Sequence, residues 1–189
     1  MSFPQVKVEL KEFLIEKRSS ILERWLRLIL ESYPPDTSKL MEQSKDRFTN
    51  PVGYVLAHEI EALYDGLLQG TGIDQASVHL EKMIQIRSVQ NFSPSQAVGV
   101  VPLLKKAIHE ELRENGNDLQ SVLPELLSDW FELESHIDRL SLLAFDIYSK
   151  YRERINEIRL NEVKKERDRT LRLLERMNSG PKGRSEPVG

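Results

Sequence analysis

Apolar residues recur at intervals of three and four along almost the whole chain of 189 residues. This spacing places them on one face of an α-helix, whereas a half-buried strand requires strict alternation. The first stripe, between residues 8 and 32, consists of Leu10, Leu14, Ile21, Trp25, Leu28 and Ile29. The sequence therefore predicts an all-α fold.

Prolines, glycines and short polar residues predict where the helices begin and end. Tyr33-Pro34-Pro35 should stop the first helix, because proline lacks the amide donor that a helix requires. Asn50-Pro51 predicts an N-cap with proline in the first helical position, and Gly70 or Gly72 predicts the end of that helix. Asp74 is expected to cap the next helix.

The stretch VQNFSPSQAVGVVPLLKK, residues 89–106, carries no charge until its last two positions. Ser93 predicts an N-cap, and Pro94 suits the first helical position. Gln96 lies three residues after Ser93, which is the spacing of a capping box. A helix is therefore expected to begin here.

Residues 97–104 are apolar or glycine on every side of this predicted helix. We therefore expect a central helix of a bundle, surrounded by protein and continuing through Leu112. Pro102 should kink it and leave the Val98 carbonyl without a donor. Beside Gly99, this is where a neighbouring helix or a small ligand could approach closely.

The last predicted helix is the longest, and its apolar spacing continues far beyond what one small core can cover. It should therefore project or pair with a second copy. Residues 150–176 hold ten basic and six acidic residues, a local charge of +4. We predict a homodimer whose interface includes Leu140, Ile147, Tyr151 and Ile158.

The domain is expected to cover residues 1–178, and its last helix to extend beyond the core. Residues 179–189 are rich in glycine, proline and serine, so a disordered tail is predicted.

The composition excludes several classes of protein. With 27 basic and 30 acidic residues, the chain has no strong field that would attract nucleic acid or anionic lipid. Cysteine is absent, so disulfides, thiolate metal sites and cysteine nucleophiles are excluded. No stretch has the pattern of a secretory signal or the roughly 18 apolar residues of a membrane span. We expect a soluble, cytoplasmic protein without a transmembrane segment.

The sequence contains no recognisable catalytic motif. It has no phosphate-binding glycine loop, no GxSxG and no HExxH. Carboxylate pairs such as Glu59/Glu61 and Glu110-Glu111 are interpreted as solvated helix faces. Of the four histidines, only His79 flanks an apolar stripe and could face a core pocket. We therefore predict no catalytic residue, no metal site and no cofactor.

Polar residues gather at two places in otherwise apolar surroundings. Arg87, Ser88, Gln90 and Asn91 precede the capping box, and Asp146, Tyr148 and Arg152 interrupt the run LSLLAFDIYSKYR. Buried polar groups require partners, so a network that fixes a helix junction is the favoured interpretation. The alternative is a ligand or partner site formed by Arg87, Gln90, Ser93, Gln96, Asp146 and Arg152.

Four stretches carry a family resemblance: ILERWLRLILESYPPDT, FTNPVGYVL, IRSVQNFSPSQAVGVVPLLKKAI and LAFDIYSKYRERINEIRLNEVKK. In this order and spacing they resemble the N-terminal sensor domain of RsbT co-antagonist proteins of the RsbRD type, over about residues 10–175. The resemblance implies a globin-like fold without haem. It also implies dimerisation and signalling along the long C-terminal helix to a phosphorylatable STAS domain of the stressosome. This chain ends where the STAS domain would begin, so we expect it to lack that output.

These observations favour a non-enzymatic sensory or regulatory module that acts through contacts with an unidentified protein partner. One alternative is a haem or small-ligand sensor with a core pocket near His79. A second follows from single-domain relatives encoded near redox complexes in anaerobic bacteria, which imply an accessory subunit or regulator. A helical enzyme with buried carboxylates is disfavoured, because no set of nucleophile, base and orienting group can be assembled.

Overall fold

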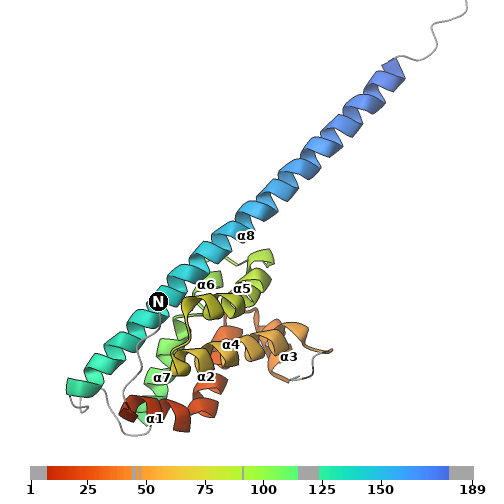
Figure 1. Cartoon of the computed structure of the whole chain (residues 1–189). Coiled ribbons are helices and arrows are strands. Elements are labelled where there is room, and N and C mark those ends of the chain that lie inside the picture. The colour runs from red at the N-terminus through yellow and green to blue at the C-terminus, as the bar shows by residue number, and fades with distance from the viewer. Residues whose placement is uncertain (1–7, 44–45, 47, 91, 115–123, 179–189) are drawn as a thin grey trace, which may run out of the picture. The chain divides into compact units, whose positions relative to one another are not determined.

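The computed structural model describes residues 8–43, 46, 48–90, 92–114 and 124–178 (Figure 1). In this part of the chain every regular element is an α-helix, as predicted. The chain divides into two units, Met1–Tyr151 and Arg152–Gly189, and the boundary falls inside the last helix. The predicted disordered tail lies outside the described residues.

Two helices replace the single helix predicted for residues 8–32. They are α1 (Val8–Glu16) and α2 (Arg18–Leu30), separated at Lys17, whose backbone (φ −93°, ψ 11°) departs from helical geometry. All six residues of the predicted stripe are nevertheless buried. The two prolines end this segment as expected, and α3 (Pro35–Gln43) begins at the second of them.

The caps of α4 (Pro51–Gln69) follow the prediction. Asn50 Oδ1 accepts a hydrogen bond from the Gly53 amide at 2.9 Å, and Pro51 occupies the first helical position. Gly70 ends the helix with φ 68°, a left-handed conformation that favours glycine.

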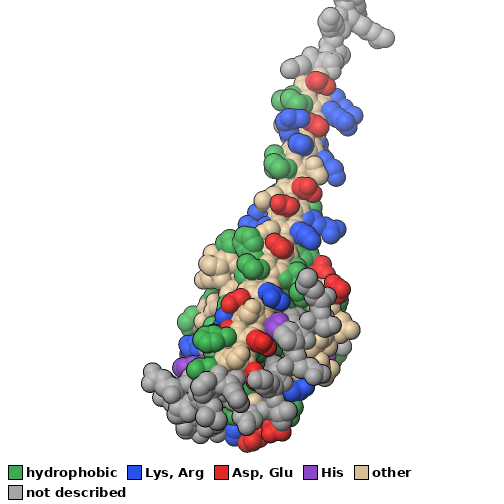
Figure 2. Space-filling view, turned by 60° about the vertical axis from the view of Figure 1, so that its left-hand side comes forward, with side chains coloured by type: hydrophobic (Ala, Val, Ile, Leu, Met, Phe, Trp, Pro, Cys, Tyr) green, Lys and Arg blue, Asp and Glu red, His purple; other side chains and the backbone are tan. Residues whose placement is uncertain are grey.

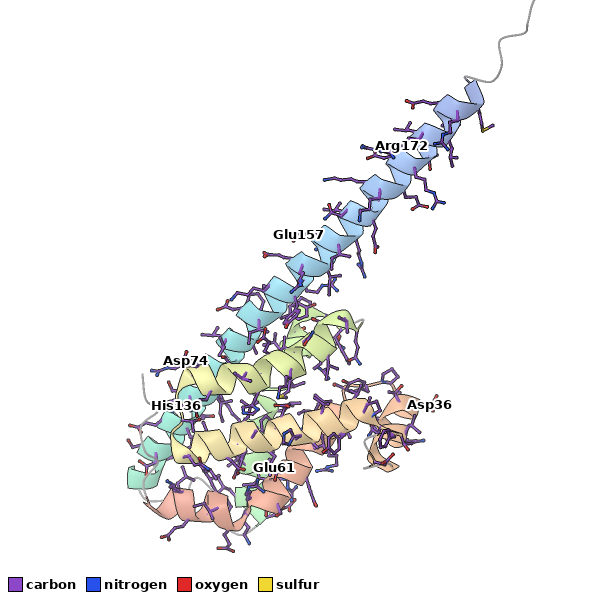
Figure 3. All side chains as sticks on the ribbon, turned by 45° about the vertical axis from the view of Figure 1, so that its right-hand side comes forward. Asp36, Glu61, Asp74, His136, Glu157 and Arg172 are labelled. Carbon is purple, nitrogen blue, oxygen red and sulfur yellow. The ribbon has the colours of Figure 1, made fainter. Side chains whose placement is uncertain are left out.

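The predicted cap of α5 (Ile73–Val89) was wrong. Gly72 is the N-cap, and Asp74 lies within the first turn (Figure 3). The helix begins earlier because the Gly72 carbonyl already accepts hydrogen bonds from the amides of Gln75 and Ala76, at 3.1 and 3.3 Å.

The expectation of one central helix after Ser93 was also wrong. The structure has a short α6 (Pro94–Val98) and a separate α7 (Leu103–Glu114), which packs against α2 and has an exposed outer face. Pro102 is exposed in the turn between them. The Val98 carbonyl accepts a hydrogen bond from the Val101 amide at 3.2 Å, so it has a partner.

The break between α6 and α7 creates a specific contact with the core. The buried indole Nε1 of Trp25 donates to the Val100 carbonyl at 2.7 Å. In a continuous helix this carbonyl would accept from Leu104, whose amide instead bonds to Val101 at 3.1 Å. Trp25 thus satisfies an acceptor that the proline-induced break leaves free.

The last helix, α8 (Pro124–Asn178), contributes to both units. Its part in the first unit completes a single core with α2, α4, α5 and α7. Large side chains that are at most 1% exposed lie at the centre of this core, among them Trp25, Tyr64, Leu80, Ile108 and Ile137.

The second unit is described by residues 152–178 of α8. Along it, hydrophobic, basic and acidic side chains are interspersed on the surface (Figure 2). None of residues 152–177 is buried. Among the described helices, none combines the length and apolarity needed to cross a bilayer.

Candidate functional site: a buried arginine junction

The guanidinium of Arg87 lies at the point where the ends of three helices meet. Arg87 belongs to the last turn of α5 and is 0% exposed. Its Nη2 donates to Ser32 Oγ, just beyond α2, at 2.9 Å. The same nitrogen donates to the Gln96 carbonyl in α6 at 3.0 Å. Arg87 therefore connects α2, α5 and α6 through one atom.

Two aromatic rings surround the guanidinium. Its Cζ lies over the ring of Phe92, 3.9 Å from the centroid, and over that of Tyr33, 5.1 Å from the centroid. The two rings form an edge-to-face pair with centroids 5.0 Å apart. Attraction between cation and ring quadrupole offsets part of the cost of burying the charge.

Burial dominates the electrostatics of this junction. It lowers the pKa of Arg87, although the nearby Tyr33 hydroxyl opposes the shift. Burial also raises the pKa of Tyr33, against the charge of Arg87. The Tyr33 hydroxyl donates to Gln90 Oε1 at 3.2 Å, which brings Gln90 into the same cluster.

Two nitrogens of Arg87 have no hydrogen-bond acceptor among the residues that the structure describes. Both Nε and Nη1 are buried, and no group in the described part of the chain accepts from either of them. No carboxylate among those residues forms an ion pair with Arg87. Buried donors without acceptors cost roughly 1–3 kcal/mol each, and more when they are charged.

Ser93 and Gln96 form the capping box that the sequence predicts. The Ser93 amide donates to Gln96 Oε1 at 3.0 Å, and the Gln96 amide donates to Ser93 Oγ at 3.3 Å. Both residues are exposed. They act on the junction by fixing the first turn of α6, whose Gln96 carbonyl accepts from Arg87.

The other predicted site residues lie elsewhere. Asp146 is exposed on α8 rather than buried in a core network, and Arg152 belongs to the second unit. Tyr148 does reach the junction, because its hydroxyl donates to the Phe92 carbonyl over 3.5 Å. Asn91 lies outside the described residues.

The interpretation of Glu59 and Glu111 as parts of solvated helix faces was wrong, because both carboxylates are buried. Glu59 is 2% exposed, its Oε2 lies 2.6 Å from His79 Nδ1, and its Oε1 accepts from Lys82 at 2.9 Å. Burial alone would raise the pKa of Glu59, but the hydrogen bonds from His79 and Lys82 outweigh it and lower the pKa.

This cluster also corrects the predicted position of His79. Its side chain is 30% exposed and contacts Glu59 at the surface, so it does not face a core pocket. Glu111 is likewise buried, and accepts from Ser20 Oγ at 2.6 Å. A signal for both carboxylates existed, since Glu59 lies three residues after Leu56 in the apolar stripe of α4, and Glu111 likewise follows Ile108 in α7.

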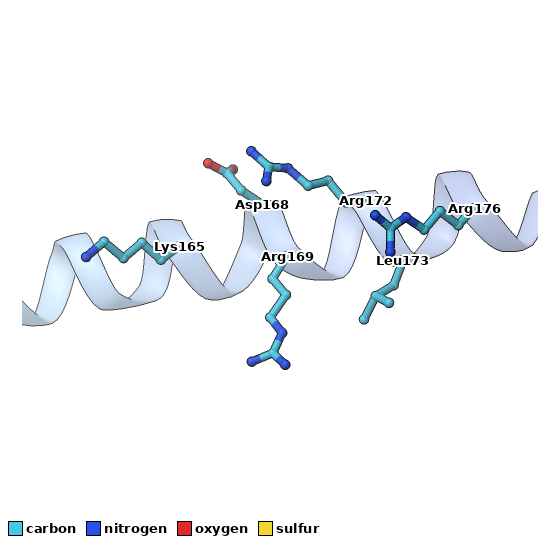
Figure 4. A pocket seen from close by; sticks show the side chains of 6 residues that line it. All are labelled: Lys165, Asp168, Arg169, Arg172, Leu173 and Arg176. Carbon is cyan, nitrogen blue, oxygen red and sulfur yellow. The ribbon is translucent and has the colours of Figure 1, made fainter.

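The second unit has an open depression along the surface of α8 (Figure 4). All of its lining residues come from this one helix, so it cannot enclose a small molecule. It is instead a basic surface, lined by Lys165, Asp168, Arg169, Arg172, Leu173 and Arg176. No group of residues suited to hold a metal ion occurs in the described part of the chain.

The model of one protein family, the RsbT co-antagonist protein rsbRD N-terminal domain, matches residues 19–163. The chain belongs to this family. It is a family of regulatory and sensory domains related to the stressosome, which agrees with the resemblance found in the sequence. No curated protein and no solved structure matches the chain. The globin-like arrangement of its helices therefore stays a prediction.

Proposed function

We propose that this protein is a non-enzymatic regulatory module of the cytoplasm that acts through protein–protein contacts, and that it works as a homodimer. The observation that carries the proposal is an exposed apolar stripe on the C-terminal part of α8. Family membership supports the regulatory role, and the basic surface opposite the stripe supports a contact with a further protein.

The stripe, named here the C-terminal seam, has the three-and-four spacing of a coiled-coil contact. Its four apolar members are between 50% and 77% exposed. Leaving a large aliphatic side chain in water forgoes roughly 1.5–3 kcal/mol, so a partner surface is expected. The seam consists of Leu160, Val163, Arg167, Thr170, Leu174 and Met177.

The interface residues predicted from the sequence need revision. Leu140 and Ile147 are buried in the core of their own unit, so they are not available to a partner. Tyr151 is half-buried, and its hydroxyl donates to Glu81 at 3.0 Å. Ile158 is 51% exposed, but it lies seven residues before Lys165 and therefore on the side of the helix opposite the seam. The proposed interface therefore consists of the C-terminal seam alone.

A second copy of the chain is the occupant that fits this seam. It presents the same apolar stripe, so two copies can bury both stripes in an isologous contact. The charges around the stripe have both signs, since residues 152–178 hold nine basic and six acidic side chains. This mixture limits the repulsion between two like helices.

Substitutions on opposite sides of the helix test the proposal. Leu160→Glu combined with Leu174→Glu should convert the dimer to a monomer, because four carboxylates would face each other in the seam. Lys165→Glu combined with Arg172→Glu is the matched control, since these residues lie on the opposite side of a helix with 3.6 residues per turn. Light scattering gives the mass, and circular dichroism checks that both variants keep their helices. A monomeric intact chain, or equal effects of the two pairs, would contradict the proposed interface.

A further inference from the structure

We propose that the Arg87 junction binds a small carboxylate, which accepts a hydrogen bond from Nε or from Nη1 of Arg87, two donors that have no acceptor in the described part of the chain. This site rests on the proposed function, because a regulatory module requires a place where its signal binds. Its evidence comes from the first unit and does not depend on the C-terminal seam.

The charge of Arg87 indicates an anion rather than a neutral ligand. The guanidinium is fully buried, and no acidic side chain pairs with it in the described part of the chain. A water molecule could accept a hydrogen bond, but it would not compensate the buried charge. Removing a charge from water costs several kcal/mol unless an opposite charge and hydrogen bonds replace the lost solvation.

The remaining donors suit a carboxylate. Arg87 has five N–H groups, and the two on Nη2 face Ser32 and the Gln96 carbonyl. The one on Nε and the two on Nη1 remain. Nε–H and the N–H groups of Nη1 point from opposite sides of the guanidinium, so a carboxylate would meet one of these donors through one oxygen, in a charge-assisted hydrogen bond.

The ligand must be small. Arg87 and its neighbour Ser88 are both 0% exposed, so the junction is closed rather than an open cleft. Formate and acetate are of the size that a modest displacement of side chains would admit. A large organic acid would require the junction to open completely.

The cover of the junction is thin. The α6 helix has five residues, and Ala97 is its only buried one. The half-buried ring of Phe92 lies directly over the guanidinium. A ligand can therefore enter by displacing Phe92 and the first turn of α6, which leaves the core helices in place.

This cover also has a connection to α8. The Tyr148 hydroxyl donates to the Phe92 carbonyl over 3.5 Å, a long bond that a small shift of Phe92 would break. Binding beneath Phe92 would thus alter a contact made by the helix that carries the proposed interface.

Thermal unfolding of the full chain, titrated with sodium acetate against sodium chloride at constant ionic strength, tests the site. Acetate should raise the Tm saturably, by about 5–10 °C at a hundredfold excess over its Kd. The rise should be absent in Arg87→Met and in Arg87→Lys, which keeps the charge but loses the Nε and Nη1 donors. Arg113→Met, at an exposed position on α7, should respond like the unaltered chain.

A second measurement on the unaltered chain covers the case in which the Arg87 variants do not fold. The Nε–H resonance of Arg87 in a ¹H–¹⁵N spectrum should shift with acetate along the same saturation curve. No saturable effect of acetate beyond chloride, an equal rise in Arg87→Met, or a response to inorganic phosphate alone would each overturn the proposal. Because these readouts report on the first unit, the site can fail while the dimer stands, and sedimentation of the same samples separates the two.

Discussion

The two parts of α8 both carry apolar side chains at helical spacing, but their surroundings differ. Between residues 124 and 151, apolar side chains at three-and-four spacing are buried in the hydrophobic core of the first unit. Residues 152–178 hold fewer apolar side chains, eight in 27 residues against 14 in the 28 residues before them, and none of the eight is buried. The apolar side chains of α8 are therefore buried within the chain in its first part and exposed to solvent in its second part.

This difference separates two sources of helix stability. Isolated helices are marginally stable in water, and most helices in proteins depend on the packing of an apolar face. The first part of α8 has that packing in its own unit. The second part requires it from outside, and in our account a second copy supplies it. Substitutions in the first unit and in residues 152–178 should therefore have different effects on stability.

The largest expected effect is on the packed side. Ile137→Ala removes a side chain that is 0% exposed and should lower the free energy of unfolding by about 2–5 kcal/mol. Ile158→Ala is the matched change on the exposed side, and should cost under ~0.5 kcal/mol at concentrations where the chain is monomeric. Urea denaturation of both variants measures the difference, and similar losses would erase the contrast.

A smaller effect is expected for the buried carboxylate of the packed unit. Glu59→Gln should destabilise the fold by about 2 kcal/mol at pH 7, because charged hydrogen bonds from His79 and Lys82 are lost. The folded-state pKa of Glu59 lies below its ordinary value of 4.5. Its contribution is therefore fully present above pH 4.5 and disappears as the pH falls through the lower, folded pKa.

Denaturation curves from pH 7 to pH 3 test this sign. The unaltered chain should lose stability below pH 4.5 more steeply than Glu59→Gln, so that the two curves converge in acid. A constant difference across this range would mean that Glu59 is not held as a carboxylate.

The smallest effect concerns the exposed cover of the packed unit. Ser93→Ala should cost about 1 kcal/mol, because the first turn of α6 loses an acceptor. Gln96→Ala should show coupling to it in a double-mutant cycle, since each side chain bonds to the other's backbone. Strictly additive losses would show that this reciprocal pair does not form in solution.

Much of the packed unit could be predicted from the sequence, because periodicity encodes which face is buried. The stripe through Trp25 and the caps at Asn50, Gly70 and Ser93 follow from local rules. The apolar residues after Ser93 led to the wrong prediction of one continuous helix. Composition does not show that the chain breaks between α6 and α7, or that the distant Trp25 donates to the Val100 carbonyl there.

The candidate site was predictable only in part. Arg87 drew attention as a polar residue at a helix junction, but its contact with Tyr33 joins residues far apart in the sequence. That Nε and Nη1 have no acceptor in the described part of the chain is a property of three-dimensional packing alone. Leu140 and Ile147 were predicted as interface residues because their spacing identifies an apolar face. The spacing does not show that this face is buried within their own unit.

Hydrogen exchange at the backbone amides of residues 152–178, measured in the intact chain at several concentrations, tests the central claim most directly. An unsupported helix exchanges quickly, whereas a helix packed in a dimer is protected in proportion to the dimer population. We expect protection of this segment to rise with protein concentration across the micromolar range, while residues 124–151 stay protected throughout. Protection of residues 152–178 that is absent, or that does not change with concentration, would contradict the account.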